Sequence, residues 1–358
     1  MALITDVKHL SSYNWIEAST PTIAVPGSPA LWTPPKGSKR LKKDSGLVYI
    51  AQNAARHPDS PLEPLFRALY ITNPSFDIRS VDIVTDRNNI RKLLSVVNPS
   101  LSKGGLEPFA ISVEITGNTA IFCREETVTH EIVGPNDFRG FGHEFEKVYT
   151  TEQVSGGTGH HRIISYRFGG LNFLVRHETD GYVGNDNGEH EDDPLSSMLG
   201  SLSLSPPNGH GHGHTPPSYT PPAGSKLTVK RKGQVVSRES TLEIKTRVAH
   251  KPLQIQEVAP QLWISQTPKL VRAHHHKGTF EETLVEDVMA EVKKWEERHQ
   301  NDLKKLAALT RKIIDEVKER GGSAIVRCDG QTGKLGFQKG RGKKMLPKDL
   351  YSKWNNLD

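Results

Sequence analysis

The chain has 358 residues, of which 35% are hydrophobic, 25% charged and 7% aromatic, and its formal net charge is +6. This composition is typical of a globular protein, and the length fits one large domain or two modest ones. Apolar runs fall short of the roughly 18 residues of a membrane-spanning helix, which excludes a membrane protein of that kind. Two cysteines, Cys123 and Cys328, are too few for a disulfide framework. With an N-terminus unlike a secretory signal, they favour the nucleus or cytoplasm.

The excess of positive charge lies at the C-terminal end. Residues 321–358 contain 8 Lys or Arg against 3 Asp or Glu, whereas the rest of the chain contains 39 against 38. We expect residues 339–358 to be a basic tail, which serves either a polyanionic partner or solubility.

The predicted elements follow in chain order. Residues 1–60 are expected to be an irregular N-terminal segment. Apolar residues at helical spacing predict three helices, and β-rich runs around turn residues predict two hairpins. Two further strands, a long helix and an edge hairpin complete the pattern. The predicted ranges are 61–71, 88–97 and 138–150 for the helices, 108–114 with 119–125 and 162–168 with 171–179 for the hairpins, 226–230 and 241–247 for the strands, 281–320 for the long helix, and 323–327 with 335–338 for the edge hairpin.

Residues 184–225 differ from the rest of the chain. They hold 7 of the 23 prolines, no Lys or Arg, and the run Gly209-His210-Gly211-His212-Gly213-His214. Such a segment cannot bury enough apolar surface to become ordered, so we predict a disordered insertion between neighbouring strands of one sheet. The chain is therefore predicted to be an α+β protein: a mixed sheet with flanking helices and a long C-terminal helix, forming one domain from residues 61–183 and 226–338.

Acidic residues occur on two of the predicted strands. Glu178 and Asp180 are two positions apart and share a face, as do Glu243 and Lys245 on the next core strand. Together they predict a carboxylate cluster with one ammonium, which suits Mg²⁺ or Mn²⁺ beside a phosphate. Glu-x-Lys on a strand is more often a salt bridge or a solvated face. Its place after an acidic strand, however, is the arrangement of the PD-(D/E)XK nuclease superfamily.

Five segments extend this pattern. They are Asp82-Ile83-Val84-Thr85-Asp86-Arg87 before a helix, Gly142-His143-Glu144-Phe145-Glu146, Glu178-Thr179-Asp180, Glu243-Ile244-Lys245-Thr246 and Leu262-Trp263-Ile264-Ser265-Gln266. In this order they resemble the motifs of the DXO-type decapping exoribonuclease family. Thr179 replaces an apolar residue and an insertion separates the third and fourth motifs, so the chain resembles a diverged branch of that family.

The resemblance implies a role for each matching residue. Glu146, Glu178, Asp180 and Glu243 would bind two divalent ions, Mg²⁺ or Mn²⁺, and Glu243, Lys245 and Asp180 would carry the catalysis. Arg87 and Gln266 would bind the substrate. The implied activity is metal-dependent hydrolysis of a phosphodiester near the 5′ end of an RNA, as in decapping or 5′-end processing.

Two alternatives remain open at this stage. One is a catalytically lapsed protein that keeps the nuclease fold as an RNA- or partner-binding module, and the other is a DNA nuclease of the same superfamily. Retention of four acids and a lysine at the motif positions favours catalysis, because uncompensated like charges destabilise a fold. The sequence does not indicate the preferred 5′ group or any exonuclease partner.

Overall fold

The computed structural model describes residues 1–102, 104–134, 136–138, 140–184 and 224–355. The predicted disorder of 184–225, with its Gly-His run, therefore falls almost wholly outside the described residues. Within the described ranges, no helix is long and apolar enough to cross a membrane.

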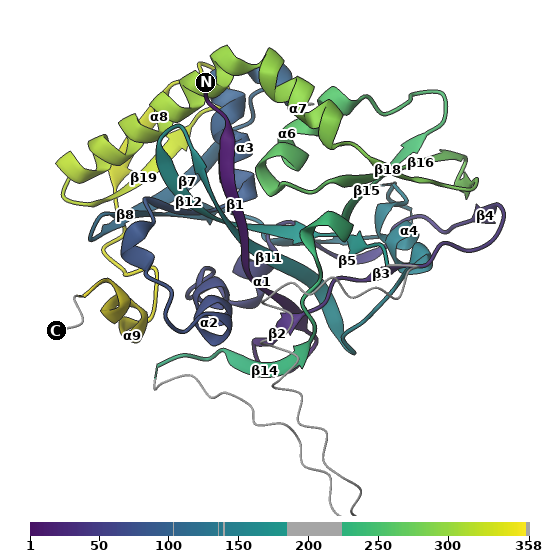
Figure 1. Cartoon of the computed structure of the whole chain (residues 1–358), viewed down its shortest axis with the longest axis horizontal. Coiled ribbons are helices and arrows are strands. Elements are labelled where there is room, and N and C mark those ends of the chain that lie inside the picture. Colours follow the sequence, from purple (N-terminus) through teal and green to yellow (C-terminus); the bar gives the residue numbers. More distant parts are fainter. Residues whose placement is uncertain (103, 135, 139, 185–223, 356–358) are drawn as a thin grey trace, which may run out of the picture.

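A ten-stranded sheet runs through the centre of the protein (Figure 1). It is mixed, because β14 with β2, β12 with β6, and β6 with β8 pair in parallel and the remaining neighbours are antiparallel. The predicted hairpins β7 with β8, β11 with β12 and β19 with β20 are confirmed. In spatial order the strands are β14 (Thr228–Gly233), β2 (Thr22–Gly27), β1 (Ile4–Ile16), β11 (Gly157–Phe168), β12 (Leu171–Thr179), β6 (Ile83–Asp86), β8 (Thr119–Glu125), β7 (Phe109–Thr116), β19 (Ser323–Cys328) and β20 (Leu335–Lys339).

A second sheet of eight strands lies beside the first. The chain passes from the larger sheet to the smaller one at Asp180, the residue between β12 and β13. In spatial order its strands are β10 (Thr150–Thr151), β3 (Leu31–Trp32), β13 (Gly181–Tyr182), β15 (Thr241–Val248), β16 (Lys269–His276), β17 (Thr279–Phe280) and β4 (Lys39–Arg40), with β18 (Val285–Asp287) paired to β16. A separate pair consists of β5 (Gly46–Tyr49) and β9 (His130–Val133).

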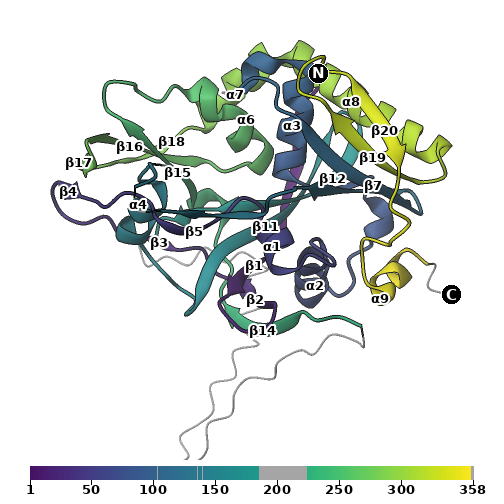
Figure 2. The ribbon, with the colours of Figure 1, turned by 180° about the vertical axis from the view of Figure 1, so that it is seen from behind.

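Helices pack on both faces of the ten-stranded sheet, as Figures 1 and 2 both show. Because successive side chains of a strand point to opposite faces, Phe173 of β12 joins one core cluster and Leu174 joins the other. The first cluster lies under α3 (Arg87–Val97), α6 (Ile255–Ser265), α7 (Met289–Arg298) and α8 (Gln300–Glu319), and the second under α2 (Glu63–Thr72) and α9 (Lys348–Tyr351). The helix α4 (Gly142–Tyr149) packs on the smaller sheet, and α1 (Gln52–Arg56) follows β5. The predicted α+β class with a mixed sheet and flanking helices is confirmed.

The expectation of an irregular segment at residues 1–60 is wrong. This region contains β1 to β5 and α1, and β1 lies between β2 and β11 inside the large sheet. Polar residues obscured the strand in the sequence, because Ser11, Ser12 and Asn14 are buried there. The Ser11 hydroxyl, for example, donates to the carbonyl of Ala68 in α2 at 2.9 Å.

The single long helix expected at residues 281–320 is also wrong. The chain forms β18 first and then two helices, α7 and α8, separated at His299. Leu284 lies within the range of the predicted helix but is 75% exposed, because Val285–Asp287 pairs with β16 and does not continue a helix. At the break, the His299 ring stacks on Trp295 with the ring centroids 4.7 Å apart.

The two strands that flank the insertion are not neighbours, contrary to expectation. The strand β13 belongs to the smaller sheet, whereas β14 forms an edge of the larger one. The basic tail also differs from its prediction in being packed. Leu346, Leu350 and Trp354 join the core under α2, and the Trp354 indole donates to the Thr119 hydroxyl at 2.8 Å.

Candidate nuclease centre

The predicted acidic residues come together where the two sheets meet. Glu178 lies on β12, Asp180 follows it, and Glu243 lies on β15, which pairs with β13. That pairing places Asp180 beside β15, and an Asp180 carboxylate oxygen accepts a hydrogen bond from the Ile244 backbone at 2.7 Å. Glu146 enters from α4, which packs on β15.

Glu243 is the most buried carboxylate of the centre, with only 2% of its surface exposed. One carboxylate oxygen, Oε2, accepts from Arg87 Nη1 at 3.2 Å, and the other, Oε1, accepts from the Lys245 ammonium and the Gln261 amide. Burial alone would raise the pKa of Glu243, but the charges and hydrogen bonds of Lys245 and Arg87 hold it down at about 2. Glu243 is therefore an anion at any physiological pH.

The other three carboxyl groups behave in the opposite way. Burial is the main reason that the pKa of Asp180 is raised to about 7, and the negative charge of Glu243 is the next largest cause. The pKa of Glu146 is also raised, mainly by burial and then by the negative charges of Asp180 and Glu178. Burial also raises the pKa of Glu178, whose carboxylate remains accessible from the adjoining pocket. These mutual influences show that the four acids form one cluster of repelling charges.

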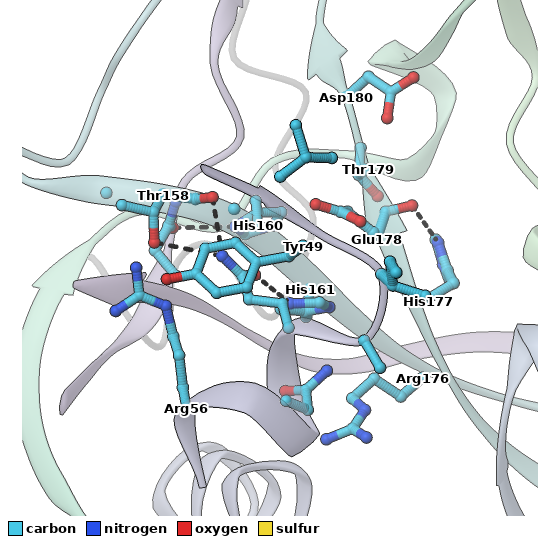
Figure 3. Close-up of a pocket in the computed structure, with 18 of the residues that line it drawn as sticks. Tyr49, Arg56, Thr158, His160, His161, Arg176, His177, Glu178, Thr179 and Asp180 are labelled. Atoms are coloured by element: carbon cyan, nitrogen blue, oxygen red, sulfur yellow. Dashed lines mark hydrogen bonds between the residues drawn. The ribbon is translucent and has the colours of Figure 1, made fainter. Parts of the chain in front are cut away.

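A pocket of about 860 Å³ opens onto this cluster. Glu146, Glu178, Asp180 and Arg87 line it, together with residues from the segment that follows β5. Figure 3 shows Glu178 and Asp180 at the end of β12, with Tyr49 and Arg56 contributed by other elements. A pocket of this size is in the usual range for a small-molecule or cofactor site, and it exceeds the volume of a metal ion with one phosphate.

The four acids fit a divalent metal by their chemistry. All are oxygen donors of the kind that Mg²⁺ and Mn²⁺ prefer, and a dication would offset the repulsion that raises the pKa values of Asp180 and Glu146. In the described part of the chain, no three His, Cys, Asp or Glu side chains are already spaced as ligands of a single ion.

The start of α3, where Arg87 lies, is held by a buried arginine that the motifs did not reveal. Arg176 of β12 is 1% exposed, and its guanidinium binds both carboxylate oxygens of Asp86, at 2.6 and 2.9 Å. It also donates to the Tyr13 hydroxyl at 3.1 Å and to the Pro61 carbonyl at 2.8 Å. Because Asp86 directly precedes Arg87, this pair joins β12 to the start of α3. An arginine after the apolar run Phe173-Leu174-Val175 was the available sequence signal.

The two glutamines of α6 occupy different positions. Gln266 ends the helix in a left-handed conformation, with φ of 54°, and its amide donates to the Trp263 carbonyl at 2.5 Å. Gln261, which the motif comparison missed, is the one that contacts Glu243. Its signal in the sequence was a polar residue within the largely apolar stretch 258–264 of that helix. The structure thus brings together six predicted residues: Arg87, Glu146, Glu178, Asp180, Glu243 and Lys245. The Gln266 side chain instead donates a hydrogen bond within its own helix.

A family model described as a domain of unknown function, DUF8563, matches residues 3–350. The chain belongs to the DUF8563 family. No curated protein matches it.

Among solved structures, this DUF8563 chain is similar to fungal Rai1 proteins. Rai1 of S. pombe shares 10% identity at a TM-score of 0.54, covering 95% of this chain and 96% of that one. Rai1 of Scheffersomyces stipitis, solved with (3′-NADP)⁺ and calcium, shares 12% at a TM-score of 0.60, covering 99% and 96%. Rai1 of Candida albicans, solved with pU5 and Mn²⁺, gives the same four values. Because the identity is so low, these similarities establish the fold alone. They confirm that the chain resembles the Rai1/DXO decapping exonucleases in its fold.

Proposed function

We propose that this protein is a divalent-metal-dependent hydrolase that cleaves a phosphodiester near the 5′ end of RNA, as in decapping or 5′-end processing. The observation that carries the proposal is the cluster of four carboxylates beside Lys245 and Arg87, which borders a pocket in a Rai1-like fold. Without a cation, the repulsion among these acids destabilises the fold. Such clusters are typical of active sites where a bound metal ion catalyses hydrolysis of a phosphate ester.

The residues have separable tasks in this proposal. Glu146, Glu178, Asp180 and Glu243 would hold Mg²⁺ or Mn²⁺, as one or two ions. The metal would supply an activated water and neutralise charge on the leaving oxygen. The hydrogen bond from the Ile244 backbone keeps the Asp180 carboxylate facing the cluster.

Lys245 and Arg87 support the anion of Glu243 in the structure described here. Among the described residues, the Arg87 guanidinium donates one hydrogen bond, to Glu243, so most of its donors are available to a substrate phosphate. Lys245 is 32% exposed at its side chain and would stabilise the developing charge on the phosphoryl oxygens. Gln266 stays a predicted substrate contact, and we add Gln261 through its hydrogen bond to Glu243.

The test is incubation with Mg²⁺ or Mn²⁺ and RNAs that carry a 5′-triphosphate, a 5′-monophosphate, a cap or an NAD cap. We expect release of the 5′ fragment from at least one of them, and its loss in the double variant Glu243→Ala with Lys245→Ala. Absence of cleavage by the wild type, or equal cleavage by the double variant, would refute the proposal. A matching DNA strand that is cleaved faster than the RNA would favour a DNA nuclease of the same superfamily.

One observation favours a second candidate, an RNA-binding module without catalysis. Both oxygens of Glu243 already accept hydrogen bonds from the protein, so metal binding there has to displace or share the Lys245 and Gln261 contacts. RNA binding that Mg²⁺ and Mn²⁺ leave unchanged, in the absence of cleavage, would support this candidate. Either candidate is expected in the nucleus or cytoplasm, which imaging of the tagged chain would test.

A further inference from the structure

Arg91 stands out among the charged residues of the pocket. It lies one helical turn after Arg87 on α3, so both side chains project from the same side of that helix. Both line the pocket. Arg91 is exposed and makes no hydrogen bond or ion pair with any other residue that the structure describes.

The positive charge of Arg91 is unfavourable in this environment when no ligand is bound. Partial desolvation and the positive charge of Arg87 lower the pKa of Arg91, and the charge of Arg124 acts in the same direction. The negative charges of Glu243 and Glu107 oppose this effect without cancelling it. Arg124 is held in place, because it donates to Glu126 at 2.5 Å and to the Ile50 carbonyl at 2.9 Å. A group of arginines that repel one another in a pocket, one of them without a partner among the described residues, is suited to bind an anion.

An aromatic and apolar wall adjoins these arginines. Tyr49 lines the pocket, and the Arg56 guanidinium lies 5.0 Å from the centre of its ring (Figure 3). Arg56 is anchored in turn by Glu17 at 2.7 Å, which braces the ring from one side. Leu47 and Ile50 also line the pocket and are 55% and 39% exposed. The Arg124 bond to Ile50 connects this wall to the arginines.

We propose that Arg91 and Tyr49 form a subsite for the unpaired RNA that continues beyond the cleaved bond. Arg91 pairs with the phosphate that follows the scissile one, and the Tyr49 ring stacks on the adjoining base. Unpaired nucleic acid presents this combination of regular phosphates and open base faces, whereas a duplex hides its base faces. The subsite rests on the proposed function, and it adds a preference for a single-stranded chain longer than a dinucleotide, which would be cleaved faster than the dinucleotide.

Binding of a 5′-phosphorylated unpaired RNA in EDTA tests the subsite without cleavage. The affinity of Arg91→Gln should fall about tenfold, the loss typical of a hydrogen bond to a charged group. In this variant, the slope of log affinity against log salt concentration should become shallower by about 0.7, which is the contribution of one phosphate contact to a single strand. Arg298→Gln, which removes an exposed arginine of α7 that does not line the pocket, should match the wild type. An unchanged salt slope in Arg91→Gln, or no RNA binding by the wild type, would overturn the subsite.

The tyrosine has its own matched pair of variants. Tyr49→Phe keeps the ring and should bind as the wild type does, whereas Tyr49→Leu should lose about tenfold in affinity. Equal losses in both variants would show that stacking is not the role of the ring.

Cleavage rates separate the failure of the subsite from failure of the proposed function. Arg91→Gln should slow cleavage of a longer RNA but leave a 5′-phosphorylated dinucleotide, which lacks the following phosphate, unaffected. If RNA is cleaved and Arg91→Gln behaves as Arg298→Gln on both substrates, the subsite alone is wrong. If no RNA is cleaved by the wild type, hydrolysis is wrong, and the binding measurements still decide the subsite.

Discussion

The buried ion pair between Arg176 and Asp86 gives the sharpest stability prediction. Arg176→Met removes the guanidinium but keeps an apolar side chain of useful length in the core. The change leaves the Asp86 carboxylate, 18% exposed at its side chain, without its partner, and it also removes the hydrogen bonds to Tyr13 and Pro61. Loss of one member of a buried pair costs about 3–5 kcal/mol, and the partial exposure of Asp86 places the expected loss near 3 kcal/mol.

That loss is a large share of the free energy of unfolding of an ordinary domain, about 5–15 kcal/mol. Urea unfolding of the metal-free protein, followed by tryptophan fluorescence, measures it directly. A second variant, Arg176→Lys, keeps the charge but cannot reproduce the two parallel bonds to Asp86, so we expect an intermediate loss.

The control for this experiment is Arg79→Met. Arg79 pairs with Asp77 at 2.7 Å, but the two side chains are 45% and 50% exposed. Exposed pairs of this kind contribute about 0–1 kcal/mol. If Arg176→Met destabilises the protein no more than Arg79→Met does, the inference that Arg176 ties β12 to α3 is refuted.

Three further predictions concern the cluster, the helix α6 and the C-terminal segment. Because the folded chain keeps the Asp180 proton up to about pH 7 and the unfolded chain releases it near pH 4, the free energy of unfolding in EDTA should fall as pH rises between about 4 and 7. Asp180→Asn should weaken that fall in urea titrations across this range, whereas the exposed-site variant Glu297→Gln should keep it, and an unchanged fall in Asp180→Asn would contradict the assigned cause. In the RNA cleavage assay, Gln261→Ala should lower kcat about tenfold through the lost hydrogen bond to Glu243, and a larger effect of Gln266→Ala would restore the original motif assignment. Trp354→Ala should cost about 3–5 kcal/mol in urea unfolding, and a loss below 1 kcal/mol would mean that the C-terminal segment is not packed as described.

Local patterns in the sequence were sufficient for much of the sheet. The runs at β8 and β12 are rich in β-branched and aromatic residues and are bounded by turns, and both strands have the predicted limits. In contrast, β1 carries buried serine and asparagine side chains whose partners lie on other elements, so its pattern resembles that of an exposed segment. Local spacing also cannot show that Val285–Asp287 finds a partner in β16, which ends the predicted long helix.

For the candidate centre, the sequence by itself determined which acids and bases are present and which pairs share a strand face. Glu243 with Lys245 is such a pair, because the two-residue period of a strand fixes it. Only the tertiary structure decided what meets across elements, namely the contact of Gln261 with Glu243, the ion pair of Arg176 with Asp86 and the place of Arg91 in the pocket lining. The physical reason is that these contacts join residues distant along the chain, whose approach depends on the packing of whole strands and helices and not on any local period.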